Sequence, residues 1–101
     1  MPIQDTKPRT TIQLETQRPR LHKVMLVNDD YTPRDFVVRV LKAEFRMNES
    51  QASKVMITAH QRGVCVVAVF TKEVAESKAT NATAAARKAG YPLLFTTEPE
   101  E

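Results

Sequence analysis

Residues 22–36 read HKVMLVNDDYTPRDF, and this stretch joins a strand to a helix through a polar turn. Its apolar part, residues 22–28, is typical of a strand, and the polar residues 28–30 form the turn that ends it. We expect Thr32 to cap the following helix. Pro33 then takes the first helical position, where the missing N–H has no partner to lose.

Two amphipathic helices are predicted downstream of this turn. Apolar side chains recur at helical spacing over residues 36–45 and again over residues 52–59. Asn48 and Gln51 have the spacing of a cap and its reciprocal partner, and Gly63 suits the end of the second helix. The sequence therefore predicts a helical pair between the first strand and whatever follows Gly63.

The rest of the chain predicts a strand, a helix and a short strand. Residues 64–70 are apolar on both faces, which favours a central strand. Thr71 can cap a third helix that runs to about Ala89, and residues 92–97 form the last strand. The order β-α-α-β-α-β predicts an α+β domain, with a three-stranded antiparallel sheet and its three helices on one face.

Length and charge bound the possible functions. The 101 residues fit one domain, and we expect it to cover residues 21–101 behind a flexible N-terminal extension of residues 1–20. Most of the net charge of +3 lies in that extension. A nearly neutral body is a weak electrostatic match for nucleic acid. No leader or membrane-spanning run is evident, so we expect a cytoplasmic protein that contacts no membrane.

Three kinds of chemistry compete for the polar residues. Cys65 could be a nucleophile, but it lies in the most apolar strand, where a buried thiol is inert. Asp29, Asp30 and His60 could hold a metal, but this set is incomplete for most metals and lacks any recognised ligand spacing. We therefore expect no catalytic residue, no metal and no cofactor.

The third chemistry is recognition of a protein N-terminus. An α-ammonium group carries three N–H donors and needs converging acceptors. The turn and the second helix offer four acceptors: Asn28, Asp29, Asp30 and His60. Nearby apolar side chains could line a hole for the first residue's side chain: Val37, Met56 and Ala59. From the residues alone, an apolar stripe of this kind is more often simply core.

Four segments together resemble the ClpS adaptor family in order and spacing. The first is VNDDYTP at residues 27–33, and the second places Met56 and His60 before Gly63. The third is VFTKEVAESK at residues 69–78, and the fourth is YPLL at residues 91–94. The resemblance covers about residues 21–97, which is the whole predicted domain.

The resemblance implies a fold and a function that composition does not. ClpS proteins have the α/β fold of the C-terminal domain of the ribosomal stalk protein. They are non-enzymatic adaptors that bind proteins beginning with Leu, Phe, Tyr or Trp, the bacterial N-degrons. They dock as monomers on the N-terminal domain of the AAA+ unfoldase ClpA, which feeds the ClpP peptidase.

The resemblance also implies roles for individual residues. Asn28, Asp29 and His60 match the contacts to the α-amino group. Seven positions match the surroundings of the side-chain pocket: Asp30, Thr32, Arg34, Val37, Met56, Ala59 and Leu93. Glu73 and Lys78 match the surface that meets ClpA. The N-terminal extension matches the segment used in substrate delivery.

Two pocket positions depart from the common family pattern. Arg34 stands where many members carry Met, and Ala59 stands where Val is common. Both changes predict a stronger preference for aromatic first residues over Leu, and they suggest a divergent second copy of ClpS. An alternative function is a modulator that binds ClpA but few N-degrons. A small RNA-binding domain is a third, which the near-neutral body disfavours.

Overall fold

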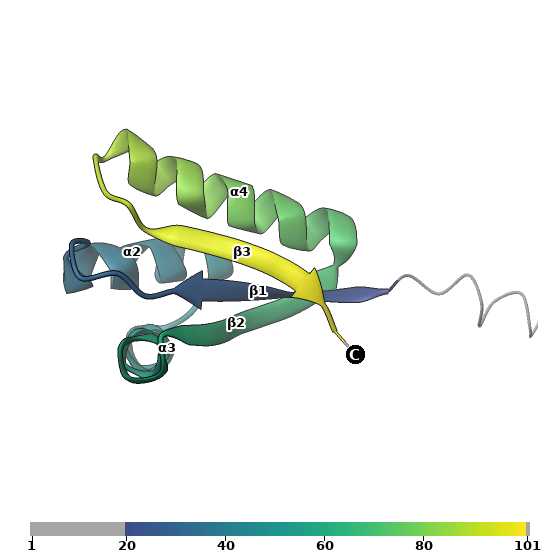
Figure 1. The fold of residues 1–101 in the computed structure, drawn as a ribbon, viewed down its shortest axis with the longest axis horizontal. Coiled ribbons are helices and arrows are strands. Elements are labelled where there is room, and N and C mark those ends of the chain that lie inside the picture. Colours follow the sequence, from purple (N-terminus) through teal and green to yellow (C-terminus); the bar gives the residue numbers. More distant parts are fainter. Residues whose placement is uncertain (1–19, 101) are drawn as a thin grey trace, which may run out of the picture.

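The computed structural model describes residues 20–100, which contain six elements in the predicted order (Figure 1). The expected extension of residues 1–20 therefore lies outside the described residues, apart from Arg20. The elements are β1 (Leu21–Val27), α2 (Arg34–Phe45), α3 (Glu49–Arg62), β2 (Val64–Thr71), α4 (Lys72–Lys88) and β3 (Leu94–Pro99).

The three strands form one antiparallel sheet in the order β2-β1-β3. The antiparallel sheet is as predicted, but the expectation that residues 64–70 form the central strand is wrong. β1 lies in the centre, and β2 is an edge strand whose outward side chains Val64, Val66 and Val69 are exposed. Apolar residues on both faces of β2 therefore reflect an apolar open face of the sheet and not burial between two neighbours.

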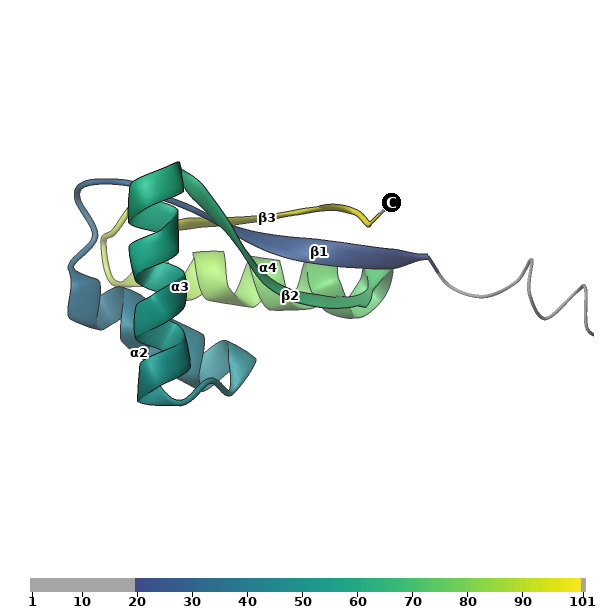
Figure 2. The same cartoon turned by 90° about the horizontal axis from the view of Figure 1, so that it is seen from below.

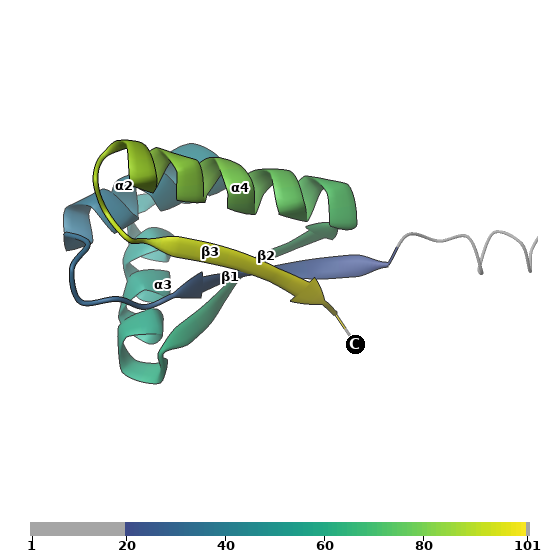
Figure 3. The same cartoon turned by 45° about the horizontal axis from the view of Figure 1, so that its top comes forward.

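One face of the sheet packs against the helices. Val24 and Leu26 of β1 are almost fully buried there, together with Phe95 of β3. The buried stripe of α4 consists only of alanines: Ala75, Ala79, Ala82 and Ala86. Alanine lets the helix axis approach the sheet closely, since it has no side chain beyond Cβ. Turned views show α4 running along the sheet while α3 crosses it near the start of β2 (Figures 2 and 3).

The opposite face of the sheet has no helix over it. Met25 at its centre pairs with Val66 on one side and Thr96 on the other, and neighbours reduce its exposure to 8%. An ion pair between Lys23 and Glu98, 3.9 Å apart, lies on the same face. The extra residue that lets β2 stay in register is Val67, which the pairing skips between Val24 and Met25.

Two of the predicted helix ends are confirmed and one is wrong. Asn48 accepts from Gln51 N at 2.7 Å, and the Gln51 side chain accepts from Asn48 N at 3.0 Å, which forms the expected capping box. Gly63 ends α3 with φ 89°. Thr32, however, does not cap α2: Pro33 occupies the capping position, one residue after the predicted one, and makes no side-chain hydrogen bond, while the Thr32 hydroxyl donates to Asp29 Oδ2.

A side chain of α4 bonds the outer edge of β3. The Phe95 N–H donates to Thr83 Oγ1 at 3.0 Å, and the same hydroxyl donates to the Phe95 carbonyl at 3.4 Å. Because β3 is an edge strand, these two backbone groups have no neighbouring strand to bond. Thr83 therefore holds α4 against β3 and gives both groups a partner.

Candidate functional site

A narrow apolar hollow lies at the C-terminal end of β1, where the sheet meets the start of α2 and the end of α3. Eight residues line it: Leu26, Val27, Asn28, Asp29, Val37, Met56, Ala59 and Leu93. Leu26, Ala59 and Leu93 form its floor, and each is at most 2% exposed. Polar groups enter from one side only, at Asn28 and Asp29. We call this hollow the end pocket.

Backbone bonding at Gly63 brings α3 to the end of β1. The Asn28 N–H donates to the Gly63 carbonyl at 3.0 Å, just beyond the pairing of Val27 with Val64. The left-handed backbone at Gly63 reverses the chain within one residue. The last turn of α3, with Ala59 and His60, is thereby fixed beside Asn28.

Asp29 organises the loop between β1 and α2. Its Oδ1 accepts from the backbone N–H groups of Tyr31 and Thr32 at 2.8 and 2.7 Å, and its Oδ2 accepts from the Thr32 hydroxyl at 2.9 Å. Such a turn is a common use of Asp. A carboxylate has roughly four acceptor sites, so Asp29 keeps capacity for a further donor at the pocket.

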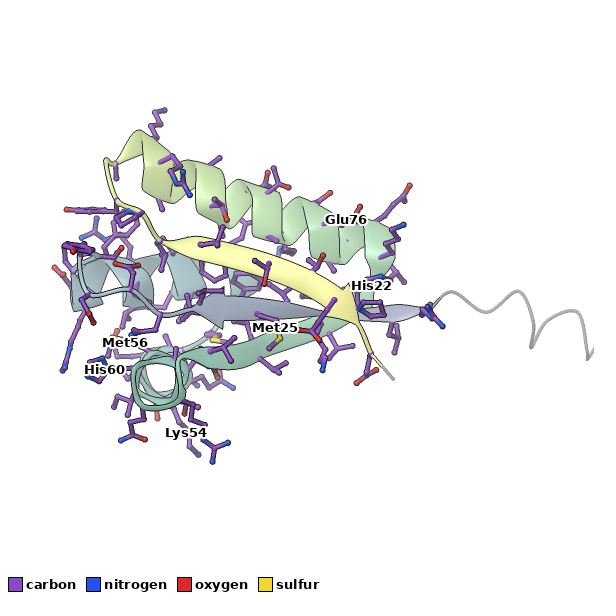
Figure 4. The ribbon with its side chains drawn as sticks, viewed as in Figure 1. His22, Met25, Lys54, Met56, His60 and Glu76 are labelled. Atoms are coloured by element: carbon purple, nitrogen blue, oxygen red, sulfur yellow. The ribbon has the colours of Figure 1, made fainter. Side chains whose placement is uncertain are left out.

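The structure brings together six of the residues predicted for the site. Asn28, Asp29, Val37, Met56, Ala59 and Leu93 all line the end pocket. His60 is exposed rather than part of the lining, but it lies on the same side of α3 as Met56 (Figure 4). Asp30 is exposed, and Thr32 reaches the site only through Asp29.

Sequence reasoning missed two lining residues, Leu26 and Val27. Both lie in the strand that leads into the polar turn. Side chains alternate between the two faces of a strand, so Leu26 could have been predicted to point inward with Val24. Nothing in the sequence marks Val27, which lines the pocket because β1 ends there.

Arg34 lies elsewhere on the surface. It is exposed at the first position of α2, where it lines a shallow hollow with Val38, Arg39 and Lys42 along the outside of that helix. It is not among the residues that line the end pocket. Arg34 and Ala59, which were expected to shape the pocket together, therefore lie in different surroundings.

Glu73 and Lys78 both lie on α4 but differ in their surroundings. Glu73 is exposed in the first turn, next to Val74, whose exposure is 42%. Lys78 is half-buried, and its Nζ donates to the Glu44 carbonyl of α2 at 2.8 Å. Asn81 approaches the Glu44 carboxylate at 3.4 Å. Lys78 is thus a contact between two helices as well as part of a surface.

The described residues do not support nucleophilic catalysis by Cys65 or binding of a metal ion. Cys65 is half-buried, and burial raises the pKa of its thiol, against a smaller lowering by Arg62. That direction disfavours the thiolate, which is the reactive form. Residues 20–100 hold no cluster of three or more metal-ligating side chains. Among the described helices, none is long and apolar enough to cross a bilayer.

Comparison with known families decides between the interpretations. The sequence model described as "ATP-dependent Clp protease adaptor protein ClpS" matches residues 17–96, most of the chain. The chain belongs to the ClpS family. ClpS proteins are adaptors and not enzymes, so the expectations of an adaptor function and of no catalysis are confirmed.

Individual ClpS relatives match over nearly their whole length. "ATP-dependent Clp protease adapter protein ClpS 2" of Mesorhizobium japonicum is 67% identical over 101 residues, which is all of both chains. ClpS 1 of Rhodopseudomonas palustris is 72% identical over 99 residues, which is 96% of each chain.

A solved ClpS structure confirms the fold. It is Agrobacterium tumefaciens ClpS2 bound to L-phenylalaninamide, which is 59% identical and superposes with a TM-score of 0.81. The superposition covers 82% of this chain and 100% of that one. The expected α+β architecture, with three helices and a three-stranded sheet, is therefore shared with this solved relative.

Proposed function

We propose that this ClpS chain binds the free α-amino group and the bulky first side chain of N-degron proteins in the end pocket. The observation that supports this most is the pairing of an apolar floor with acceptors on one side, at Asn28 and Asp29. A first residue inserted from the open side would bury its side chain against Leu26, Ala59 and Leu93. Its ammonium group would then remain at the mouth, beside the polar residues.

The ligand of the agrobacterial relative has the expected chemistry. L-Phenylalaninamide combines a free α-amine, a benzyl side chain and an amide that replaces the next peptide bond. These are the groups that the start of a Phe-initiated protein would present. His60 is the proposed third contact to the amine, since it lies one turn from Met56 on the same side of α3.

The proposal extends to delivery of the captured protein. A monomer of this chain would dock on the N-terminal domain of a ClpA-type unfoldase in the cytoplasm, with Glu73 and Lys78 at the contact. The unfoldase would then pass the substrate to ClpP. Glu73 is available for such a contact because it is exposed in the first turn of α4.

Peptides that differ only at the terminal amine test the capture step. Acetylation removes the positive charge and leaves acceptors without a donor. Loss of one charge-assisted hydrogen bond should therefore weaken a Phe-initiated peptide by at least about tenfold, measured by fluorescence anisotropy. A Gly-initiated peptide with a free amine is the matched control for the side chain. Equal affinity for free and acetylated peptides would exclude amine recognition and leave the modulator function as the alternative.

A further inference from the structure

Two aromatic side chains join the segments that carry Val37 and Leu93 into the end pocket. The ring of Phe36, in the first turn of α2, lies against the ring of Tyr91, in the loop between α4 and β3. The ring centroids are 4.8 Å apart and the planes are tilted by 58°, which is a favoured arrangement for an aromatic pair. The start of α2 and this loop lie at the same end of the molecule (Figures 1 and 3).

Each ring lies close in the chain to a residue of the pocket. Phe36 directly precedes Val37, and Tyr91 lies two residues before Leu93. Val37 and Leu93 are 6% and 2% exposed, and both line the end pocket, whereas neither ring does. Val37 moves with a helix and Leu93 with the loop that enters β3. The space between them therefore depends on how closely these two segments approach each other.

The end of α4 fixes Tyr91 from one side. The Tyr91 N–H donates to the Ala86 carbonyl at 2.8 Å, and the Gly90 N–H donates to the Arg87 carbonyl at 3.0 Å. With φ of 89° at Gly90, these two bonds form a Schellman motif, which sets the path of the chain just after a helix. Pro92 follows and restricts the backbone further. The ring of Tyr91 is thereby carried by α4.

The first turn of α2 fixes Phe36 from the other side. Its N–H donates to the Pro33 carbonyl at 3.1 Å, and Cζ of Arg39 lies 6.0 Å from the centroid of its ring, within the range of a cation–π contact. Among the hydrogen bonds of the described chain, none joins residues 28–37 to residues 89–93. The aromatic pair is thus the specific contact that the structure shows between these segments.

We propose that Phe36 and Tyr91 are positioning residues for the end pocket, whose contact sets the separation of Val37 and Leu93. The pair acts through these two residues and makes the pocket selective for a bulky first side chain. This inference rests on the proposed capture of N-degrons. Without the pair, α2 and the loop before β3 can shift relative to each other. A binding site loses selectivity when the residues that support its lining are no longer held in place.

Two matched substitutions on α2 test this inference. Phe36→Leu removes one ring of the pair. Phe45→Leu is the control, because it removes a ring of the second aromatic pair, in which Phe45 and Phe95 lie 5.5 Å apart and neither lines the end pocket. We expect Phe36→Leu to lower the ratio of affinities for Phe- and Gly-initiated peptides by at least about threefold, measured by fluorescence anisotropy. Phe45→Leu should leave this ratio within about twofold, even where urea unfolding shows that it lowers stability.

Tyr91 supplies a second variant and a conservative one. Tyr91→Leu should lower the Phe-to-Gly ratio as Phe36→Leu does, and the double variant should lower it no further, because the contact is already lost. Tyr91→Phe keeps the ring and should stay within about twofold of the wild type. The ratio of affinities for free and acetylated Phe peptides should change by less than about twofold in every variant, since the acceptors at Asn28 and Asp29 are untouched.

The outcomes separate this inference from the proposed function. A Phe-to-Gly ratio that survives in Phe36→Leu and Tyr91→Leu, or that falls equally in Phe45→Leu, would overturn the positioning role and leave N-degron capture intact. A wild-type chain that bound Phe- and Gly-initiated peptides equally would overturn both. Tyr91 is only half-buried, so its variants decide the question even if Phe36→Leu does not fold.

Discussion

At the scale of single residues, Asp29 combines a structural role in its loop with the recognition role proposed for it. Its carboxylate accepts three hydrogen bonds from the loop between β1 and α2, and it also lines the end pocket. The loop geometry and the negative charge can be separated by substitution. Asn keeps an oxygen for the two backbone N–H groups and can donate to the Thr32 hydroxyl, whereas Ala removes every bond.

We predict that Asp29→Asn weakens binding of a free-amine Phe peptide by about tenfold, because a charge-assisted contact is lost. Its free energy of unfolding in urea should change by less than about 1 kcal/mol, since the loop bonds have substitutes. Asp29→Ala should weaken binding further and also lower stability by about 1–3 kcal/mol. Wild-type affinity in Asp29→Asn would mean that the carboxylate serves only the loop.

Ala59 is the second residue with a direct consequence for the pocket. It is 1% exposed and lines the floor, so a larger side chain there takes space from the ligand. We predict that Ala59→Val lowers the ratio of Phe to Leu peptide affinity by up to about tenfold, as one or two methyl groups can do in an apolar pocket.

Arg34→Met is the matched control for Ala59→Val, because Arg34 lines a different hollow on the outside of α2. Its ratio of Phe to Leu affinity should stay within about twofold of the wild type. That result would show that Ala59 affects the choice of first residue and Arg34 does not, although the sequence predicts the same effect for both. A larger shift in Arg34→Met than in Ala59→Val would contradict this assignment.

At the scale of elements, helix α4 links the core, the neighbouring helix and the surface. Its alanine stripe faces the sheet, while Lys78 donates to the carbonyl of Glu44 at the end of α2. Carbonyls at the end of a helix have no partner within it, and a Lys side chain there stabilises the terminus. Glu73 has no comparable contact in the described structure and is free to meet another protein.

We predict that Glu73→Lys abolishes binding to the N-terminal domain of ClpA and leaves peptide affinity and stability unchanged. Glu76→Lys, the same charge change one turn further along α4, is the control and should bind ClpA normally. Lys78→Met should lose ClpA binding and also about 1 kcal/mol of stability, because the Glu44 carbonyl loses its donor. Titration calorimetry and urea unfolding measure the two effects. If Glu73→Lys binds ClpA normally, the ClpA contact does not include Glu73 and must lie elsewhere on the surface.

Elements were easier to predict from the sequence than their arrangement. The capping box at Asn48 and the stop at Gly63 follow from local chemistry, and the structure has both. The strand order does not follow from local chemistry. A strand that is apolar on both faces, such as β2, can lie in the centre of a sheet or at an edge with one apolar face open to solvent. The predicted cap of α2 is wrong because the helix begins at Arg34, which puts Pro33 and not Thr32 at the capping position, and Thr32 instead donates to Asp29 within the preceding loop.

At the scale of the whole molecule, the proposed recognition and docking sites lie at opposite ends of β1. The end pocket adjoins Asn28, and the first turn of α4 lies beside His22. The seven residues of β1 span about 20 Å, so a bound substrate and a docked unfoldase need not touch the same surface. An adaptor with this layout can carry its substrate while it is attached to its partner.

The hydroxyl of Thr83 has a consequence for how copies of this chain behave when they are crowded. An exposed edge strand is a template for pairing with a strand from another molecule, and such pairing is the first step of aggregation. On β3, the backbone groups of Phe95 that an incoming strand would need are already bonded to Thr83. Thr83 thereby blocks an incoming strand from bonding to Phe95 at the β3 edge of the sheet.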